Sequence, residues 1–126
     1  MKKIPVVIVH ENYEKYLKIN LDITTKNNHV YLIGNKELAN LESENVTFVD
    51  IYKYKNLSQI NIMKENFTNY GAKDDRTELF WFSRVIMISE FMKEYKVEKI
   101  FNIDSDNILL DDVNKYPYSH ENALCI

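Results

Sequence analysis

Two aspartates, Asp104 and Asp106, have the type and spacing in this sequence that most clearly indicate chemistry. They follow the apolar run at residues 99–103, and in an extended strand residues two apart point to the same side, about 7 Å apart. Both carboxylates could therefore converge on one cation. Two like charges beside so much apolar chain are costly without a counter-charge, and a divalent metal is the usual relief. An all-oxygen ligand set favours Mg²⁺ or Mn²⁺. Because polar turns often contain aspartates, the pair alone also fits a turn without a metal.

Arg84 is the second residue that needs an explanation. It lies within residues 79–88, a stretch that is apolar nearly all round. An unpaired guanidinium there would be very costly, and the positions three and four residues away hold no acid. Arg84 is therefore expected either to form a salt bridge with a distant carboxylate or to clamp a phosphate or a ligand-site aspartate. The aromatic cluster around Trp81 is expected to pack in the core or at an interface rather than against a sugar.

Short apolar runs and helical periodicities indicate the elements that position these residues. We expect strands at 4–9, 30–33, 46–51 and 99–103, and a further strand beginning at 123–126. We expect helical segments at 13–26, 36–41, 56–70 and 76–95, with Asn12 capping the first, Gly71 ending the third and Asp75 with Glu78 forming a capping box for the last.

This alternation of strands and helices predicts an α/β fold with a largely parallel sheet in the order 3-2-1-4. In such sheets ligands bind at the carboxyl ends of the strands, where the strand order reverses. Polar residues follow two of these strands: His10, Glu11 and Asn12 after the first, and Asp104, Ser105 and Asp106 after the fourth. If the two strands are neighbours, both groups line one crevice.

Composition limits the classes of function. The chain has 126 residues, the length of one domain spanning 1–126, and a net charge of −3, which gives no reason to expect nucleic acid. No run approaches the roughly 18 apolar residues of a membrane span. The single cysteine, Cys125, fits a reducing, cytoplasmic environment. With only two glycines there is no Gly-rich phosphate loop, so a bound diphosphate would need a metal and side chains.

Four segments in this order resemble the nucleotide-binding half of retaining GT-A glycosyltransferases of the bacterial galactosyltransferase and glycogenin type. They are Val9-His10-Glu11-Asn12-Tyr13, Phe82-Ser83-Arg84, Ile103-Asp104-Ser105-Asp106-Asn107-Ile108-Leu109 and Ala123-Leu124-Cys125-Ile126. The resemblance covers nearly all of this chain but only the first half of that family's catalytic domain. The chain has Glu11 where the family more often has aspartate.

The resemblance implies a role for each matching residue. Asp106 would be a direct metal ligand, and Asp104 would bind the metal, the donor ribose or both. Glu11 and Asn12, next to His10, would touch the base or ribose. Arg84 would orient the donor phosphates or the sugar, and Tyr13 would stack on the base or pack in the core.

The function expected from this resemblance is a glycosyltransferase, or its donor-binding portion, that uses a UDP-hexose and Mn²⁺ or Mg²⁺. The family's acceptor half, with its third metal ligand, would lie beyond Ile126, so no catalytic base can be named. Two alternatives stay open: a non-catalytic nucleotide-sugar-binding or assembly module, and an unrelated α/β interaction domain. The apolar helix at 76–95 also predicts a homo-oligomer or a partner chain that covers it.

Overall fold

The computed structural model describes residues 3–71 and 73–116 of the chain. The expected strand at 123–126 lies outside the described residues. The elements follow one another in the order β1 (Val6–Val9), α1 (Lys15–Thr24), β2 (Val30–Gly34), the 3₁₀ helix η1 (Lys36–Leu41), β3 (Val46–Asp50), α2 (Tyr52–Lys55), α3 (Ser58–Glu65), α4 (Asp75–Tyr95), β4 (Phe101–Asn102) and the 3₁₀ helix η2 (Val113–Lys115).

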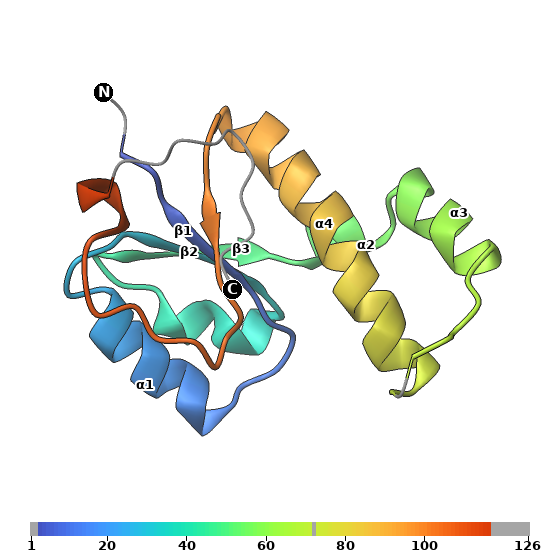
Figure 1. Ribbon diagram of the computed structural model, residues 1–126, viewed down its shortest axis with the longest axis horizontal. Coiled ribbons are helices and arrows are strands. Elements are labelled where there is room, and N and C mark those ends of the chain that lie inside the picture. Colours follow the sequence, from blue (N-terminus) through green and yellow to red (C-terminus); the bar gives the residue numbers. More distant parts are fainter. Residues whose placement is uncertain (1–2, 72, 117–126) are drawn as a thin grey trace.

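The four strands form one sheet in the order β3-β2-β1-β4, and every pair is parallel. This confirms the predicted α/β class and strand order. Consecutive strands build the sheet outward from β1 through β2 to β3, and β4 then returns to the other side of β1 (Figure 1). The strand order therefore reverses between β1 and β4. The four residues of β1 are all buried, as expected of a strand with helices on both faces.

Two hydrophobic clusters hold the layers together, one on each face of the sheet. Val6 and Ile8 pack on one side with Leu17 and Leu21 of α1. Val7 and Val9 face the other side, where α2, α3 and α4 contribute their buried residues. In Figure 1, α1 covers one face of the sheet, α4 crosses the other, and α3 lies outward of α4. Successive side chains of β1 point to opposite faces of the sheet, so this one strand contributes residues to both hydrophobic clusters.

Several predicted element ends differ from the structure. α1 begins at Lys15 after Glu14, not after Asn12, whose side-chain oxygen instead accepts a hydrogen bond of 2.8 Å from the Asn35 amide. α4 is capped by Asp74 rather than Asp75, and the Asp74 carboxylate accepts the Thr77 N–H at 2.9 Å. The start of α1 depends on the contact between Asn12 and Asn35, and the start of α4 depends on which of two adjacent aspartates forms the cap. The periodicity of the apolar residues indicates neither.

The helix predicted at 56–70 is wrong in extent. Within this range only α3 is helical, and Leu57, which has an extended backbone, separates it from α2, which ends at Lys55 before the predicted start. α3 ends at Glu65, and the side-chain amide of the capping residue Asn66 donates to the carbonyl of Ile62 at 2.9 Å. Gly71 does not adopt a positive φ and so does not form the expected left-handed cap.

Candidate functional site

A cleft of about 570 Å³ lies at the carboxyl edge of the sheet, where the strand order reverses between β1 and β4. Of the eight site residues predicted from the sequence, seven line it: His10, Glu11, Asn12, Arg84, Asp104, Ser105 and Asp106. They come from three segments that are far apart in the chain. The expectation that the polar groups after β1 and β4 share one crevice is therefore confirmed.

The aspartates reach this cleft on a turn and not on a strand. β4 ends at Asn102, and the N–H of Asn107 donates to the carbonyl of Asp104 at 3.0 Å. The strand geometry assumed for the pair is therefore wrong. Asp106 is exposed, and the Asp104 side chain is 57% exposed. Both carboxylates remain accessible to a ligand.

Asn20 of α1 holds this turn, and sequence reasoning missed it. Its side chain is fully buried and donates to the carbonyls of Ser105 at 2.8 Å and Asn107 at 2.7 Å. Thr24 donates to the Asn20 side-chain oxygen at 2.6 Å and accepts the N–H of Leu109 at 3.1 Å. Two polar residues on the apolar face of α1 were a signal that this helix supports something other than a hydrophobic core.

Arg84 forms an ion pair with Asp104, with Nη1 donating to Oδ1 at 2.8 Å. The arginine side chain is 24% exposed and projects from α4 into the cleft, where Phe80 and Trp81 also lie. The predicted salt bridge to a distant carboxylate is thus confirmed, and the partner is one of the two aspartates. Arg84 thus already supplies a positive charge to Asp104, one of the two aspartates of the turn.

Glu11 is also paired. Its Oε2 accepts from the Lys55 ammonium at 3.1 Å and lies 3.9 Å from Nη2 of Arg76. The Glu11 side chain is 20% exposed, so it stands at the inner wall of the cleft. A ligand that used Glu11 as a hydrogen-bond acceptor would share it with these two cations.

His10 directly follows β1 and lines the cleft next to Tyr16 of α1. Its ring meets Tyr16 edge-on with 5.8 Å between centroids, and its buried Nε2 has no hydrogen-bond partner among the described residues. Burial lowers the pKa of His10, although a hydrogen bond from the ring to the backbone of Asn12 and the charges of Glu14 and Glu11 oppose this. The ring is therefore held neutral near pH 7 and presents an unused polar atom beside the cleft.

The aromatic residues differ most from expectation. Tyr13 is 49% exposed, so it does not pack in the core, and it is not among the residues that line the cleft. Tyr16, one helical turn further along, lines the cleft instead. Trp81 is 42% exposed and also lines the cleft, so of the two expected roles, in the core or at an interface, only the interface remains.

The carboxylates can be tested against the cation that the resemblance implies. Within residues 3–71 and 73–116, no group of three His, Cys, Asp or Glu side chains could hold a metal ion. Mg²⁺ usually retains waters and takes one or two carboxylates plus the phosphates of its substrate. Asp104 and Asp106 fit that arrangement, in which the ligand completes the coordination. They do not fit an ion held by protein side chains alone.

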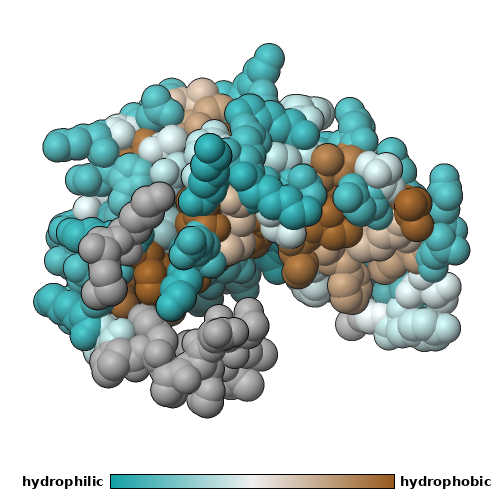
Figure 2. Space-filling model, turned by 90° about the horizontal axis from the view of Figure 1, so that it is seen from above, coloured by the Kyte–Doolittle hydropathy of each residue, from teal (hydrophilic) through white to brown (hydrophobic). Residues whose placement is uncertain are grey.

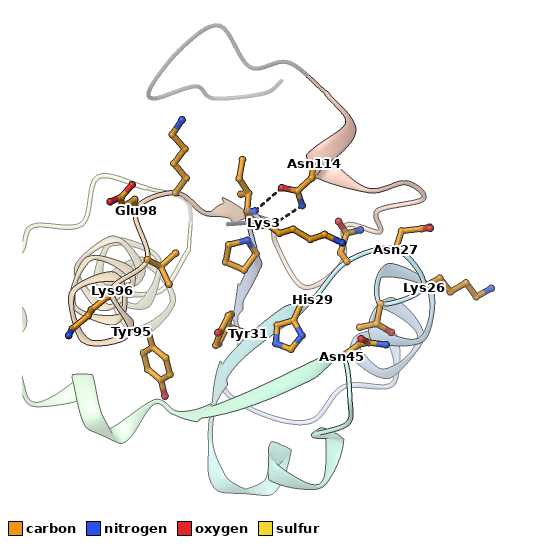
Figure 3. Close-up of a pocket in the computed structure, with 16 residues that line it drawn as sticks. Lys3, Lys26, Asn27, His29, Tyr31, Asn45, Tyr95, Lys96, Glu98 and Asn114 are labelled. Atoms are coloured by element: carbon orange, nitrogen blue, oxygen red, sulfur yellow. Dashed lines mark hydrogen bonds between the residues drawn. The ribbon is translucent and has the colours of Figure 1, made fainter. Parts of the chain in front are cut away.

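A larger cavity, of about 910 Å³, lies at the opposite edge of the sheet, where the strands begin. His29 and Tyr31 lie at its centre, whereas Lys26 and Lys96 extend away from it (Figure 3). These two lysines follow the carboxyl ends of α1 and α4, where positive charge complements the helix dipole. The side chain of Asn114 bonds both the N–H of Ile4 at 2.7 Å and its carbonyl at 3.1 Å. The polar groups here are largely used by the fold.

One face of α4 is apolar and exposed. Trp81, Phe82 and Val85 are 42%, 57% and 71% exposed, and Ile62 of α3 is 59% exposed. Brown side chains gather over the right half of the molecule in Figure 2, where α3 and α4 lie in Figure 1. In the described part of the chain, no helix combines the length and apolar character needed to cross a bilayer.

Residues 6–85 match a family described as "Protein of unknown function (DUF1374)". The chain belongs to this family. The matched segment contains β1, β2, β3 and the first half of α4, including Arg84, and it ends before the turn that carries Asp104 and Asp106. No curated protein and no solved structure matches the chain.

Proposed function

We propose that this chain binds a nucleotide sugar, with a UDP-hexose as the expected donor, and that it is a glycosyltransferase or the donor-binding portion of one. One observation carries the proposal. Seven polar residues predicted from three distant segments converge on a single cleft, at the edge and the strand reversal where open α/β sheets bind ligands. Of these residues, Arg84 and Asp104 are in direct contact.

The chemistry of the cleft suits a diphosphate. Asp104 and Asp106 would hold Mg²⁺ or Mn²⁺ together with the ligand's phosphates, and the ion would stabilise the negative charge that develops as the sugar–phosphate bond breaks. Arg84 would then exchange part of its contact with Asp104 for a phosphate oxygen, because a guanidinium can bind both anions at once. Asn12, exposed at the end of β1, would bond the base or ribose, beside Glu11.

Calorimetry with UDP, with and without Mn²⁺, tests the proposal. We expect metal-dependent binding that is lost in Asp106→Asn and retained in Asp22→Asn. Asp22 is a matched control because it is exposed on α1, pairs with Lys18 and lies outside the cleft. Absence of UDP binding at every metal concentration would contradict the proposal and favour an unrelated α/β interaction domain.

Binding without turnover is the second candidate function, a nucleotide-sugar-binding or assembly module. It is favoured by the lack of a third metal-ligating side chain in the described part of the chain. Release of UDP from a panel of UDP-hexoses, with acceptors supplied, separates the two candidates. Metal-dependent binding with no release would support the module, and release above the rate without protein would support the transferase.

We also propose that a second protein surface, from another copy of this chain or from a partner chain, covers the exposed face of α4. Contiguous apolar side chains of this kind mark interaction sites more often than free surface. Light scattering of the wild type and of Val85→Lys tests self-association, with Ile19→Lys on α1 as a control at another exposed apolar position. A wild-type monomer at all concentrations would contradict the homo-oligomer.

A further inference from the structure

A smaller cavity of about 220 Å³ lies beside the cleft, between α4 and the segment that contains α2 and α3. Glu11 and Phe80 line both spaces. We term this cavity the side pocket. Three of its residues are cations, Lys55, Lys64 and Arg76, and the others include three apolar residues, Ile60, Leu79 and Met87. An anionic ligand group bound in the side pocket would therefore be near both cationic and apolar side chains.

The charges of the side pocket do not balance. Its three cations face one carboxylate, so the pocket carries a charge of +2 in a chain whose net charge is −3. Glu11 pairs closely with Lys55, at 3.1 Å, and more distantly with Arg76, at 3.9 Å. Within the described residues, no carboxylate lies within the 4.0 Å of a salt bridge from Lys64.

Among the described residues, the nearby acids Asp74, Asp75 and Glu78 form no salt bridge with Arg76. Asp74 caps α4 by accepting the N–H and the hydroxyl of Thr77, at 2.9 and 3.1 Å. Asp75 accepts from the Asn69 side chain at 3.0 Å. Arg76 also lies in the first turn of α4, where the helix dipole adds to the positive potential. Lys64 and Arg76 therefore stand next to the cleft with their charges open to solvent and available to an entering anion.

We propose that the side pocket binds a second anionic group of the substrate, a carboxylate or phosphate in addition to the nucleotide diphosphate. The inference rests on the proposed function only in assigning that group to a substrate of the neighbouring cleft. Lysine and arginine both bind such oxyanions, and Arg76 and Lys64 can turn toward one because their side chains are exposed. Glu11, already neutralised by Lys55, does not oppose it.

A titration of the ¹⁵N-labelled protein with inorganic phosphate, at low and constant ionic strength, tests the anion site directly. We expect amide shifts around Lys64 and Arg76, and an affinity weakened about fivefold or more in the double variant K64Q/R76Q. The control is K18Q/K36Q, which removes the same charge from exposed lysines that line neither the cleft nor the side pocket. Absence of these shifts, or equal weakening in both double variants, would overturn the proposal.

Repeating the titration on protein saturated with UDP and Mg²⁺ shows whether the side pocket binds an anion in addition to the diphosphate of UDP. Phosphate that still binds supports the proposal, and phosphate that UDP displaces overturns it. Failure of UDP to bind would contradict the proposed function alone, because the titration without UDP still tests the side pocket.

Two further comparisons identify the source of the anion. Tighter binding of UDP-glucuronate than of UDP-glucose, with the difference lost in K64Q/R76Q, would assign it to the donor sugar. Binding of glucose 6-phosphate to the UDP-bound protein, lost in the same variant, would assign it to the acceptor. If neither difference depends on Lys64 and Arg76, the side pocket does not recognise a substrate anion.

Discussion

The two edges of the sheet differ in what their polar residues do. At the carboxyl edge, side chains from distant segments meet as charged pairs, as in Arg84 with Asp104 and Glu11 with Lys55. At the opposite edge the cavity is larger, yet its asparagines bond backbone groups, as Asn114 does with Ile4 and Asn28 with Val113.

The difference indicates that the larger cavity is not the better candidate for a ligand site in this fold. The helices α1 and α4 run antiparallel to the strands, so their C-terminal ends and carbonyls lie at the edge where the strands begin. Lysines there complement the helices. The charged residues at the carboxyl edge instead pair with one another around a cleft, which makes them the better candidates for binding a ligand.

The largest expected effect concerns Asp106. Replacing it with alanine removes one of two carboxylates from the proposed cation site, so metal-dependent UDP affinity should fall about 100-fold. Lys3→Gln, at the other edge, should leave that affinity unchanged. Calorimetry measures both, and a similar loss in the two variants would remove the distinction between the edges.

Two buried asparagines give a matched test of position. Asn20→Ala leaves the carbonyls of Ser105 and Asn107 without their donor and should destabilise the fold by about 2–3 kcal/mol. Asn28→Ala, near the opposite edge, removes bonds to Asp111 and Val113 and should cost a similar amount. Urea unfolding measures the stabilities.

Only Asn20→Ala should also weaken UDP binding by the folded protein, because only Asn20 holds the turn that carries the aspartates. Equal loss of UDP affinity in the two asparagine variants would indicate a general effect of destabilisation rather than of position.

Arg84→Met should weaken UDP binding about tenfold, because one charge-assisted contact to phosphate is lost. Stability should change by less than about 1 kcal/mol, since Asp104 is more than half exposed and solvent screens the pair. Affinity for Mn²⁺ alone should rise, because the arginine no longer competes for Asp104. Weaker Mn²⁺ binding in this variant would contradict the assignment.

The smallest expected effect is a pH dependence. Burial lowers the pKa of His10 below 6.5, so the unfolded chain takes up a proton more readily than the folded protein. The contribution of His10 to stability is thus complete above about pH 6.5 and falls as the pH decreases through the lowered value. Carboxylates such as Glu94, whose hydrogen bonds lower its pKa below 4.5, act only at lower pH.

Urea unfolding between pH 5 and 7 measures this slope. His10→Gln should flatten it, and His29→Gln, an exposed histidine at the other edge, is the matched control. An unchanged slope in His10→Gln would show that other groups produce it.

The sheet order and the cleft were predictable because they follow from apolar runs and from a topological rule. Arg84 was predictable as a paired residue because its apolar surroundings demand an anion, although its partner remained open between a distant carboxylate, a phosphate and a ligand-site aspartate. The sequence shows Asn20 on the apolar face of α1 with Leu17 and Leu21, but not the turn some 85 residues later that it bonds.

The ends of α1 and the position of Tyr13 were not predictable for a similar reason. Asn12 bonds Asn35, 23 residues away, instead of capping the helix, so the helix starts later. That shift places Tyr16 rather than Tyr13 at the cleft. The spacing of residues within α1 does not show that Asn35 binds the Asn12 side chain, which would otherwise be free to cap the helix.

The pairing of β1 with β4 has a consequence for folding. Val6 pairs with Phe101, 95 residues later, through a strand of only two residues at the edge of the sheet. Closing so long a loop is slow and comes after the local β1–β2 pairing, so the turn with the aspartates docks late. Amide hydrogen exchange should find β4 opening before β2, and each such opening would separate Asp104 from the segment after β1 while the rest of the sheet stays folded.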